Sequence, residues 1–495
     1  KPIMSVDAML YHAPTAAHIV STNSLWSWVP VSYYSFYPDL LAVQAAGIFE
    51  ATGSVRFMDA VQTPFFLIFA LTTWVWAGNG RPRRIPSALA VLVLAIPALY
   101  ANARVFYVDV AFGAVLLAAL WLLGRWITTR DSRWLPLAAI LFGATASIKP
   151  SGAPVLVLAS IVVLALGVAR SRLRPSLWFC ATAGVVAAPF YLRNLFEFQN
   201  PFYPLSVGIP GIKFEGELTV DSMYGGLVPE QLEGLAPGVA LIRNLFISAF
   251  SGPDAVNYDV RLGGFGYPIL VAVILAGTLI IAGLFTRRAP NVARSVWIFP
   301  LAGALVLAFL QPESWYPRYS LATVALLFIL LGLVAGSMRL SVRIQNVIAV
   351  PIVVVSVTLM WSYESSMLAG LRMINDQWSA NPNYNQGVSG WNPAYDQAYA
   401  WTKSLPCGTK IRLPGDAKPV GVYGSYSIGL WGNQLCNEVV TSELSQDPLN
   451  ESDSWDYLVV DANSLTRWTE QAQKRGVCLQ EVGRAPMAFD REQAV

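Results

Sequence analysis

Long apolar segments recur along this sequence, and each approaches the roughly 20 residues that an α-helix needs to cross the hydrocarbon core of a bilayer. Only 13% of the residues are charged, about half the fraction usual in a soluble domain, while 55% are hydrophobic. Such a chain has too little polar surface to cover a large soluble globule. It is therefore predicted to be a polytopic α-helical membrane protein with ten visible spans, at 57–78, 86–103, 108–125, 134–148, 152–169, 176–192, 265–285, 295–311, 318–336 and 344–362.

Basic residues are concentrated in alternate loops between these segments. One set of loops holds Arg81, Arg83, Arg84, Arg125, Arg130, Arg133, Arg170, Arg172, Arg174, Arg287, Arg288, Arg294, Arg339 and Arg343. The short loops of the opposite set hold only Arg104, Lys149 and Arg318. The positive-inside rule places the arginine-rich loops in the cytoplasm. Residues 1–56, 193–264 and 363–495 are then expected on the extracytoplasmic side of the cytoplasmic (inner) membrane.

Within the first loop, 1–56, residues 9–50 are expected to lie at the membrane surface. The sequence starts at Lys1-Pro2 without an initiator Met or a signal-peptide pattern, so a further apolar span is expected to precede it in the intact protein. Aromatic side chains mixed with Ser, Asn and Pro are typical of the headgroup region. Interfacial helices are predicted near 39–50, where Asp39 is a candidate cap, and near 239–250, which is alternatively a cover over a cavity.

The polar tail, 363–495, is predicted to form a small extracytoplasmic α/β domain that follows the transmembrane domain, 1–362. The pattern indicates helices near 393–404 and 464–475, and strands near 409–413, near 455–461 and from 478.

The four cysteines are interpreted by their place in this topology. Outside the cytoplasm, Cys407 and Cys436 are candidates for a disulfide, although Cys478 competes for either partner. Cys180 falls within a span, where packing is its expected role.

The sequence lacks the motifs that are typical of several classes of function. No C-x-x-C pair, zinc-ligand spacing, P-loop or G-x-S-x-G is present, which argues against metalloenzymes, nucleotide-binding proteins and serine hydrolases. The net charge of +3 gives no nucleic-acid footprint. With only His12 and His18, a His-rich metal site is excluded, whereas a divalent cation held by carboxylates such as Asp7 and Asp109 stays open. No other cofactor is assigned.

Ionisable residues lie at the predicted outer ends of the spans. They are Asp7, Arg104, Asp109, Lys149, Arg193 and Arg318. An ionisable group at this depth is costly, so a functional role is the starting hypothesis. The structural alternatives are an ordinary loop carboxylate for Asp7, an interfacial anchor for Arg318, and snorkelling to the interface for Lys149 and Arg193. Asp109 alternatively pairs with Arg104 or another cation.

These residues belong to motifs with a fixed order along the chain. The motifs are Asp7 with Tyr11-His12, the aromatic Tyr33–Pro38, Tyr107-x-Asp109, Lys149-Pro150, Arg193-Asn194 with Asn200–Pro204, and Arg318-Tyr319. Together they resemble the polyprenyl-phosphate-dependent glycosyltransferases of the C superfamily, and among them the bacterial mannosyltransferase and aminoarabinose-transferase-like membrane enzymes. The resemblance covers roughly 1–362 and departs from the family in lacking the first helix. It implies a glycosyltransferase fold and activity.

The chemistry of such an enzyme assigns a role to each residue. Nucleotide-sugars are absent outside the cell, so the activated sugar must arrive on a lipid phosphate. Arg318 is the strongest candidate to bind that phosphate, because its guanidinium fork matches phosphate oxygens, with Lys149, Arg193 and Arg104 as helpers. Asp7 is the candidate general base for the acceptor hydroxyl, which gives inversion in one displacement. The supporting or substrate-binding candidates are Tyr11, His12, Asp109 and Tyr319.

The predicted function is therefore transfer of a sugar from a polyprenyl-phosphate donor to an envelope glycan, lipid or protein. The alternative is a non-catalytic membrane subunit of an envelope complex that retains this fold. A transporter ranks third. Transporters are expected to have polar residues at the middle of the membrane, often in two related halves of the chain, whereas the charges here cluster at one face of the membrane. Membrane lipids, the lipid-linked sugar and the envelope acceptor are the expected partners.

Overall fold

The computed structural model describes most of the chain in two compact units. The described residues are 7–26, 33–209, 211–219, 228–251, 259–286, 294–311, 313–338, 340–379, 402, 404–413, 434–441, 456–458 and 465–474. The first compact unit, called here the terminal unit, comprises Lys1–Val61, Val105–Tyr107 and Arg372–Val495. The second, called the helical unit, comprises Gln62–Arg104 and Val108–Leu371.

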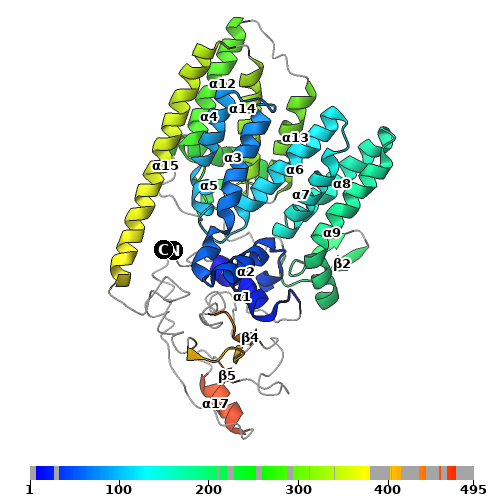
Figure 1. The fold of residues 1–495 in the computed structure, drawn as a ribbon, viewed down its shortest axis with the longest axis vertical. Helices are drawn as coiled ribbons and strands as arrows, with labels where there is room; N and C mark the ends of the chain where they lie inside the picture. Colours follow the sequence, from blue (N-terminus) through cyan, green and yellow to red (C-terminus); the bar gives the residue numbers. More distant parts are fainter. Residues whose placement is uncertain are drawn as a thin grey trace. The chain divides into compact units, whose positions relative to one another are not determined.

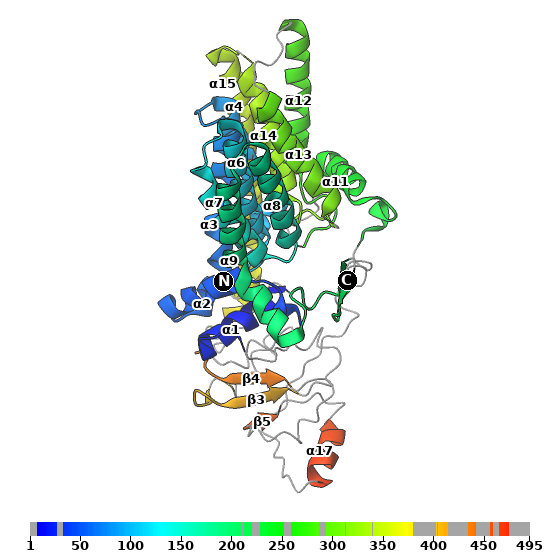
Figure 2. The ribbon, with the colours of Figure 1, turned by 90° about the vertical axis from the view of Figure 1, so that its right-hand side faces the viewer.

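The helical unit is built from long apolar helices that run side by side (Figures 1 and 2). They are α3 (Thr63–Ala77), α4 (Arg84–Leu94), α5 (Pro97–Asn102), α6 (Asp109–Thr129), α7 (Trp134–Ile148), α8 (Gly152–Ala169), α9 (Leu173–Phe198), α11 (Pro237–Ser251), α12 (Tyr267–Thr286), α13 (Arg294–Leu310), α14 (Leu321–Ser337) and, as far as Leu371, α15 (Val342–Ser379). A short hairpin of β1 (Val207–Ile209) and β2 (Ile212–Phe214) and a turn of 3-10 helix, η4 (Glu230–Leu232), precede α11.

Every apolar segment predicted to span the membrane is helical. Among the described residues, five helices are both long and apolar enough to cross a bilayer, and several apolar helices are shorter. The five are Phe57–Ala77, Asp109–Thr129, Gly152–Ala169, Leu173–Phe198 and Val342–Ser365. The chain is thus a mostly helical, multi-pass membrane protein, and the count of ten spans stays a prediction.

The expectation of one continuous helix over 86–103 was wrong. The segment divides into α4 and α5, and Ile96 between them has an extended backbone with φ −66° and ψ 119°. Pro97 causes this break, because proline has no N–H for the helical ladder and its ring disfavours helical geometry in the preceding residue. Helix α14 also begins later than predicted, at Leu321, so Arg318 lies in the loop before it.

Close packing of small residues holds these helices together. Helix α7 packs between α6 and α9, and α14 contacts α3, α4 and α13. At Gly143 of α7, an added Cβ would lie 2.6 Å from the carbonyl oxygen of Ala183 in α9, so this approach requires glycine. Small residues allow such close contacts between membrane helices. Large apolar side chains such as Val185 and Trp361 are instead about three-quarters exposed (74% and 75%), as expected for surfaces that face lipid.

The N-terminal part of the terminal unit contains η1 (Ala8–His12), α1 (Ala13–Thr22), η2 (Tyr33–Phe36) and α2 (Leu40–Thr52), followed by η3 (Val55–Gln62), which leads into α3. The predicted helix near 39–50 is confirmed as α2. Its cap is Asp39, whose side chain accepts a hydrogen bond from the backbone N–H of Ala42 at 3.0 Å. Helix α1, which packs on α2, was not predicted.

The C-terminal part of the terminal unit contains a parallel sheet with strand order β4-β3-β5. The strands are β3 (Lys410–Leu413), β4 (Glu438–Thr441) and β5 (Tyr457–Leu458), and helix α17 (Leu465–Lys474) follows them. Strands β3 and β5 and helix α17 fall within predicted elements, whereas β4 was missed. The strand expected from 478 and most of the helix expected near 393–404 lie outside the described residues.

A disulfide joins Cys407 and Cys436, which precede β3 and β4. The backbone N–H of Gly408 also donates to the carbonyl of Cys436 at 2.9 Å, so the entries to the two strands are linked twice. Cys478 lies outside the described residues. Cys180 is a free, half-buried cysteine within α9.

Candidate active site

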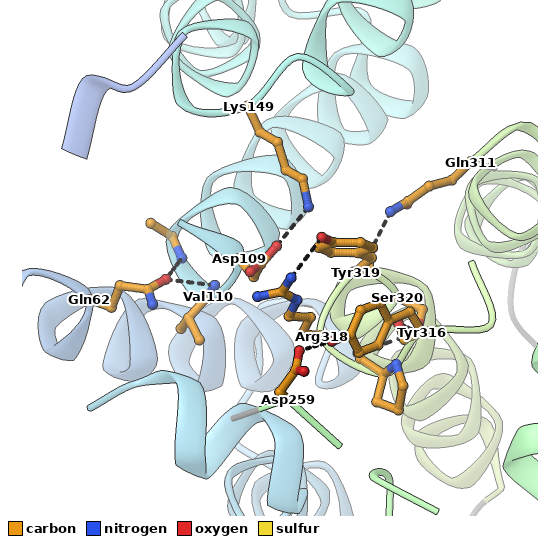
Figure 3. Close-up of polar contacts among 12 residues, drawn as sticks. Gln62, Asp109, Val110, Lys149, Asp259, Gln311, Tyr316, Arg318, Tyr319 and Ser320 are labelled. Atoms are coloured by element: carbon orange, nitrogen blue, oxygen red, sulfur yellow. Dashed lines mark hydrogen bonds and ion pairs between the residues drawn. The ribbon is translucent and has the colours of Figure 1, made fainter. Parts of the chain in front are cut away.

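Three ends of helices bring charged side chains together in the helical unit. Asp109 is the first residue of α6, Lys149 follows the last residue of α7, and Arg318 lies in the loop between α13 and α14. Figure 3 shows their side chains pointing toward one another, with the ring of Tyr319 beside them. We call Asp109, Lys149, Arg318 and Tyr319 the cationic cluster.

Lys149 is held by a carboxylate and an aromatic ring. Its Nζ lies 2.7 Å from Oδ1 of Asp109 and 3.2 Å from the centroid of the Tyr319 ring. The side chains of Lys149 and Asp109 are only 17% and 4% exposed. Burial lowers the pKa of Lys149, and the neighbouring Asp109 carboxylate opposes that shift. The ion pair that the sequence left open for Asp109 is thus made with Lys149.

Arg318 is buried between two tyrosines. Its guanidinium carbon lies 4.9 Å from the ring centroid of Tyr316 and 4.8 Å from that of Tyr319. Its Nη2 donates a hydrogen bond to the Tyr319 hydroxyl at 2.9 Å, and the residue is 7% exposed. Stacking on tyrosine rings fixes the plane of the guanidinium, and a planar fork held in one orientation suits recognition of an oxyanion.

Three hydrogen bonds fix the shape of the loop 311–320, which carries Arg318. Nε2 of Gln311 donates to the carbonyl of Tyr319 at 3.0 Å, which closes the loop. The Tyr316 hydroxyl donates to the Asp259 carboxylate (Figure 3). Nδ2 of Asn244, in α11, donates to the carbonyl of Trp315 at 2.8 Å. One internal hydrogen bond therefore closes the loop and two others anchor it to Asp259 and Asn244, which keeps Arg318 in place.

The start of α6 is anchored in the same way. Oε1 of Gln62 accepts hydrogen bonds from the backbone N–H groups of Val110 and Ala111 at 2.8 and 3.2 Å (Figure 3). Its Nε2 donates to the carbonyl of Asn102 at 2.8 Å. The first N–H groups of a helix lack partners within the helix. Gln62 satisfies two of them and so fixes the turn that presents Asp109.

Glu313 is an ionisable residue of this loop that sequence analysis missed. It is 4% exposed, and burial raises its pKa to about 8, although Lys149 and Arg318 act in the opposite direction. The available signal was its position, because it is the carboxylate in the short outer connection between two apolar segments.

Two further cations predicted to bind phosphate have other partners. Arg104 forms an ion pair with Glu364 and donates to the Tyr100 hydroxyl at 2.6 Å. Glu364 was also missed, because it lies in α15, far along the chain from Arg104. Arg193, at the end of α9, is 1% exposed, and its Nε donates to Asn194 at 3.0 Å.

The remaining candidates belong to the terminal unit. Asp7 is half-buried and immediately precedes η1, which contains Tyr11 and His12. Nδ1 of His12 lies 2.5 Å from Oδ2 of Asp39, and the imidazole stacks on Phe106 with centroids 5.5 Å apart. The Tyr11 ring lies 5.8 Å from that of Tyr34. Asp39 therefore both caps α2 and orients His12.

Over the described ranges, no group of three or more His, Cys, Asp or Glu residues is arranged to hold a metal ion.

A solved structure shares the fold of this chain. No family model matches the sequence, and no curated protein matches it. Among solved structures, ArnT from Cupriavidus metallidurans bound to undecaprenyl phosphate is similar over 98% of this chain and 93% of its own, with 16% sequence identity and a TM-score of 0.57. This similarity confirms the predicted fold, which is that of the glycosyltransferases of the C superfamily.

Two other solved structures show weaker similarity. ArnT from the same organism in the apo state is 14% identical, over 95% of this chain and 84% of its own, with a TM-score of 0.40. The Archaeoglobus fulgidus oligosaccharyltransferase, in complex with Zn and sulfate, is 14% identical, over 89% of this chain and 59% of its own, with a TM-score of 0.48.

Proposed function

We propose that this protein is a membrane glycosyltransferase that moves a sugar from a polyprenyl-phosphate donor to an envelope acceptor on the extracytoplasmic side. The observation that carries the proposal is the buried cationic cluster, in which Lys149 and Arg318 lie against Tyr319 in a chain with the fold of ArnT. The solved ArnT structure contains undecaprenyl phosphate, a ligand of this chemical class.

The cluster supplies what a departing phosphate needs. Negative charge develops on the phosphate as the sugar–phosphate bond breaks, and preorganised cations stabilise it best where water is excluded. Arg318 provides a two-pronged donor and Lys149 a point charge. Asp109 favours the ionised form of Lys149, since the carboxylate opposes the fall in pKa that burial causes. Arg193 and Arg104 are proposed as auxiliary cations for the phosphate group and its approach.

The acceptor hydroxyl needs a base, and we assign this role to Asp7. In a single displacement, the carboxylate takes the hydroxyl proton as the acceptor oxygen bonds to the anomeric carbon and the phosphate leaves from the opposite face. The configuration at that carbon is therefore inverted. Tyr11 and His12, in the helical turn that follows Asp7, are proposed to contact the acceptor.

Replacing Asp7 tests the enzymatic function directly. Asp7→Asn keeps the shape of the side chain and removes its basicity, so transfer is expected to fall by about 10²-fold or more. Membranes containing each variant are incubated with labelled polyprenyl-phosphate sugars, and label in the envelope fraction is counted. The matched control is Glu50→Gln, which replaces an exposed carboxylate of α2 and is expected to leave transfer unchanged.

The same experiment addresses the rival function. If the protein is a non-catalytic subunit, it should bind polyprenyl phosphate, but the wild-type protein should transfer no sugar. That result should hold both in isolated membranes and after the other subunits of its complex have been added back. Equal transfer by wild type and Asp7→Asn would remove Asp7 from the mechanism.

A further inference from the structure

Glu313 is the buried carboxylate nearest in sequence to Arg318, and the proposed mechanism does not use it. Only 4% of the residue is exposed, and its Oε1 atom has no hydrogen-bond partner among the described residues. A buried carboxyl group is normally satisfied by hydrogen bonds, because an unsatisfied polar atom in the interior costs free energy. An orphaned oxygen beside a cationic cluster therefore suggests a partner that arrives from outside.

The charges around Glu313 define what that partner can be. Lys149, Arg318 and Arg261 favour the ionised carboxylate, while Asp109 and burial disfavour it. Burial is the largest of these effects and raises the pKa to about 8, so the group is mainly a neutral acid at pH 7. A neutral carboxylic acid has an O–H donor, and an ionised one has only acceptors.

We propose that Glu313 is a further ligand of the donor phosphate, to which it donates a hydrogen bond as a neutral acid while Lys149 and Arg318 supply positive charge. The inference rests on the proposed function. A neutral donor is well suited to this position, since the anion is stabilised without adding a third cation to the buried cluster. The hydrogen bond becomes stronger as negative charge grows on the departing phosphate. Glu313 is thus assigned to the binding site, in the same loop as Arg318.

A dependence of binding on pH follows from this assignment. Above a pH of about 8 the free protein holds Glu313 ionised, whereas the complex requires the protonated form. The dissociation constant should then rise by about tenfold per pH unit above this value, since binding takes up one proton. Below it, binding should be independent of pH as far as Glu313 is concerned.

The test measures binding of a polyprenyl methyl phosphate to the full-length protein in detergent micelles. This phosphodiester keeps a single negative charge from about pH 6.5 to about pH 9.5, so the probe itself does not titrate. Glu313→Gln keeps a neutral N–H donor at every pH and should bind with a weaker dependence on pH than wild type. The matched control is Glu215→Gln, which replaces an exposed carboxylate that pairs with Lys213 and should behave as wild type.

Titration of Lys149 also weakens binding at high pH, and a second variant separates the two groups. In Lys149→Arg the cation stays ionised throughout the range, so the loss of affinity above about pH 8 should persist. Combining it with Glu313→Gln should abolish that loss. Thermal unfolding of each variant at pH 7 checks that it is folded. The pH profile of Lys149→Arg tests the inference even if Glu313→Gln does not fold, because Glu313 is intact in that variant.

The outcomes distinguish the inference from the function on which it rests. If wild type binds the probe and Arg318→Ala binds it weakly, but Lys149→Arg shows no loss of affinity up to about pH 9.5, Glu313 is not a ligand. Parallel pH profiles for wild type and Glu313→Gln also overturn the inference. If wild type shows no saturable binding at any pH, or Arg318→Ala binds as tightly, the proposed donor site itself is wrong.

Discussion

The pair of Lys149 and Asp109 illustrates how this protein keeps positive charge in a buried place. A lysine so little exposed would tend to lose its proton, because burial disfavours the charged form. The Asp109 carboxylate at 2.7 Å and the Tyr319 ring at 3.2 Å both stabilise the ammonium. The ammonium is thus favoured by two neighbours and its position is fixed, which is what the proposed phosphate ligand requires.

Arg318 should contribute through both its charge and its shape. Arg318→Ala is expected to raise the dissociation constant for polyprenyl phosphate by about tenfold or more, the effect of losing a hydrogen-bonded pair of opposite charges. Arg318→Lys should restore only part of the affinity, because an ammonium lacks the planar fork. Fluorescence or calorimetric titration in micelles measures both. Arg133→Ala is the control, since that side chain is 89% exposed in the loop before α7. Equal affinity for Arg318→Ala and wild type would contradict the assignment of Arg318 to the phosphate site.

At the scale of helices and strands, features that depend on nearby sequence were predictable. Apolar segments of sufficient length predicted the helices, and Asp39 was identified as a cap because its side chain needs only the backbone three residues later. Glu364 and strand β4 were missed, since each depends on a partner distant in the chain: Glu364 pairs with Arg104, and β4 pairs with β3 across the intervening segment. Glu313 was missed although its position in the short connection before Arg318 is visible in the sequence. Pro97 itself indicated a break in the helix, but the continuous apolar pattern over 86–103 led to the prediction of a single helix.

Helix α2 provides a test of these local rules. Asp39→Ala removes both the cap of α2 and the partner of His12, and it should lower the free energy of unfolding by about 2 kcal/mol. Asp39→Asn should cost less, because asparagine is also a good cap although it lacks the charge that pairs with histidine. Thermal unfolding in micelles shows which of the two variants is the less stable. Glu50→Ala, on the exposed side of α2, should change stability by less than about 0.5 kcal/mol, and an equal loss from all three would show that the cap contributes nothing.

For the whole molecule, two independent properties point to the same orientation in the membrane. The arginines are concentrated in one set of loops, which the positive-inside rule assigns to the cytoplasm. The disulfide between Cys407 and Cys436 belongs to the tail, and disulfides persist in oxidising compartments outside the cytoplasm. A charge rule applied to loops and a redox rule applied to the tail do not share assumptions, so their agreement favours an extracytoplasmic tail.

This orientation determines which substrates can reach the cationic cluster, and it can be measured without knowing them. Lys149 and Arg318 lie in loops of the set that alternates with the arginine-rich loops, so an extracytoplasmic tail puts the cluster on the side where sugars arrive on lipid carriers. A reporter that fluoresces only in the cytoplasm, fused to the C-terminus of the full chain, should stay dark. Alkaline phosphatase at the same position should be active, since it needs an oxidising compartment. The reporter fused after Arg130, in an arginine-rich loop, should fluoresce and serves as the control. A fluorescent C-terminal fusion would place the cluster in the cytoplasm, where nucleotide-sugars are available, and a lipid-linked donor would no longer be required.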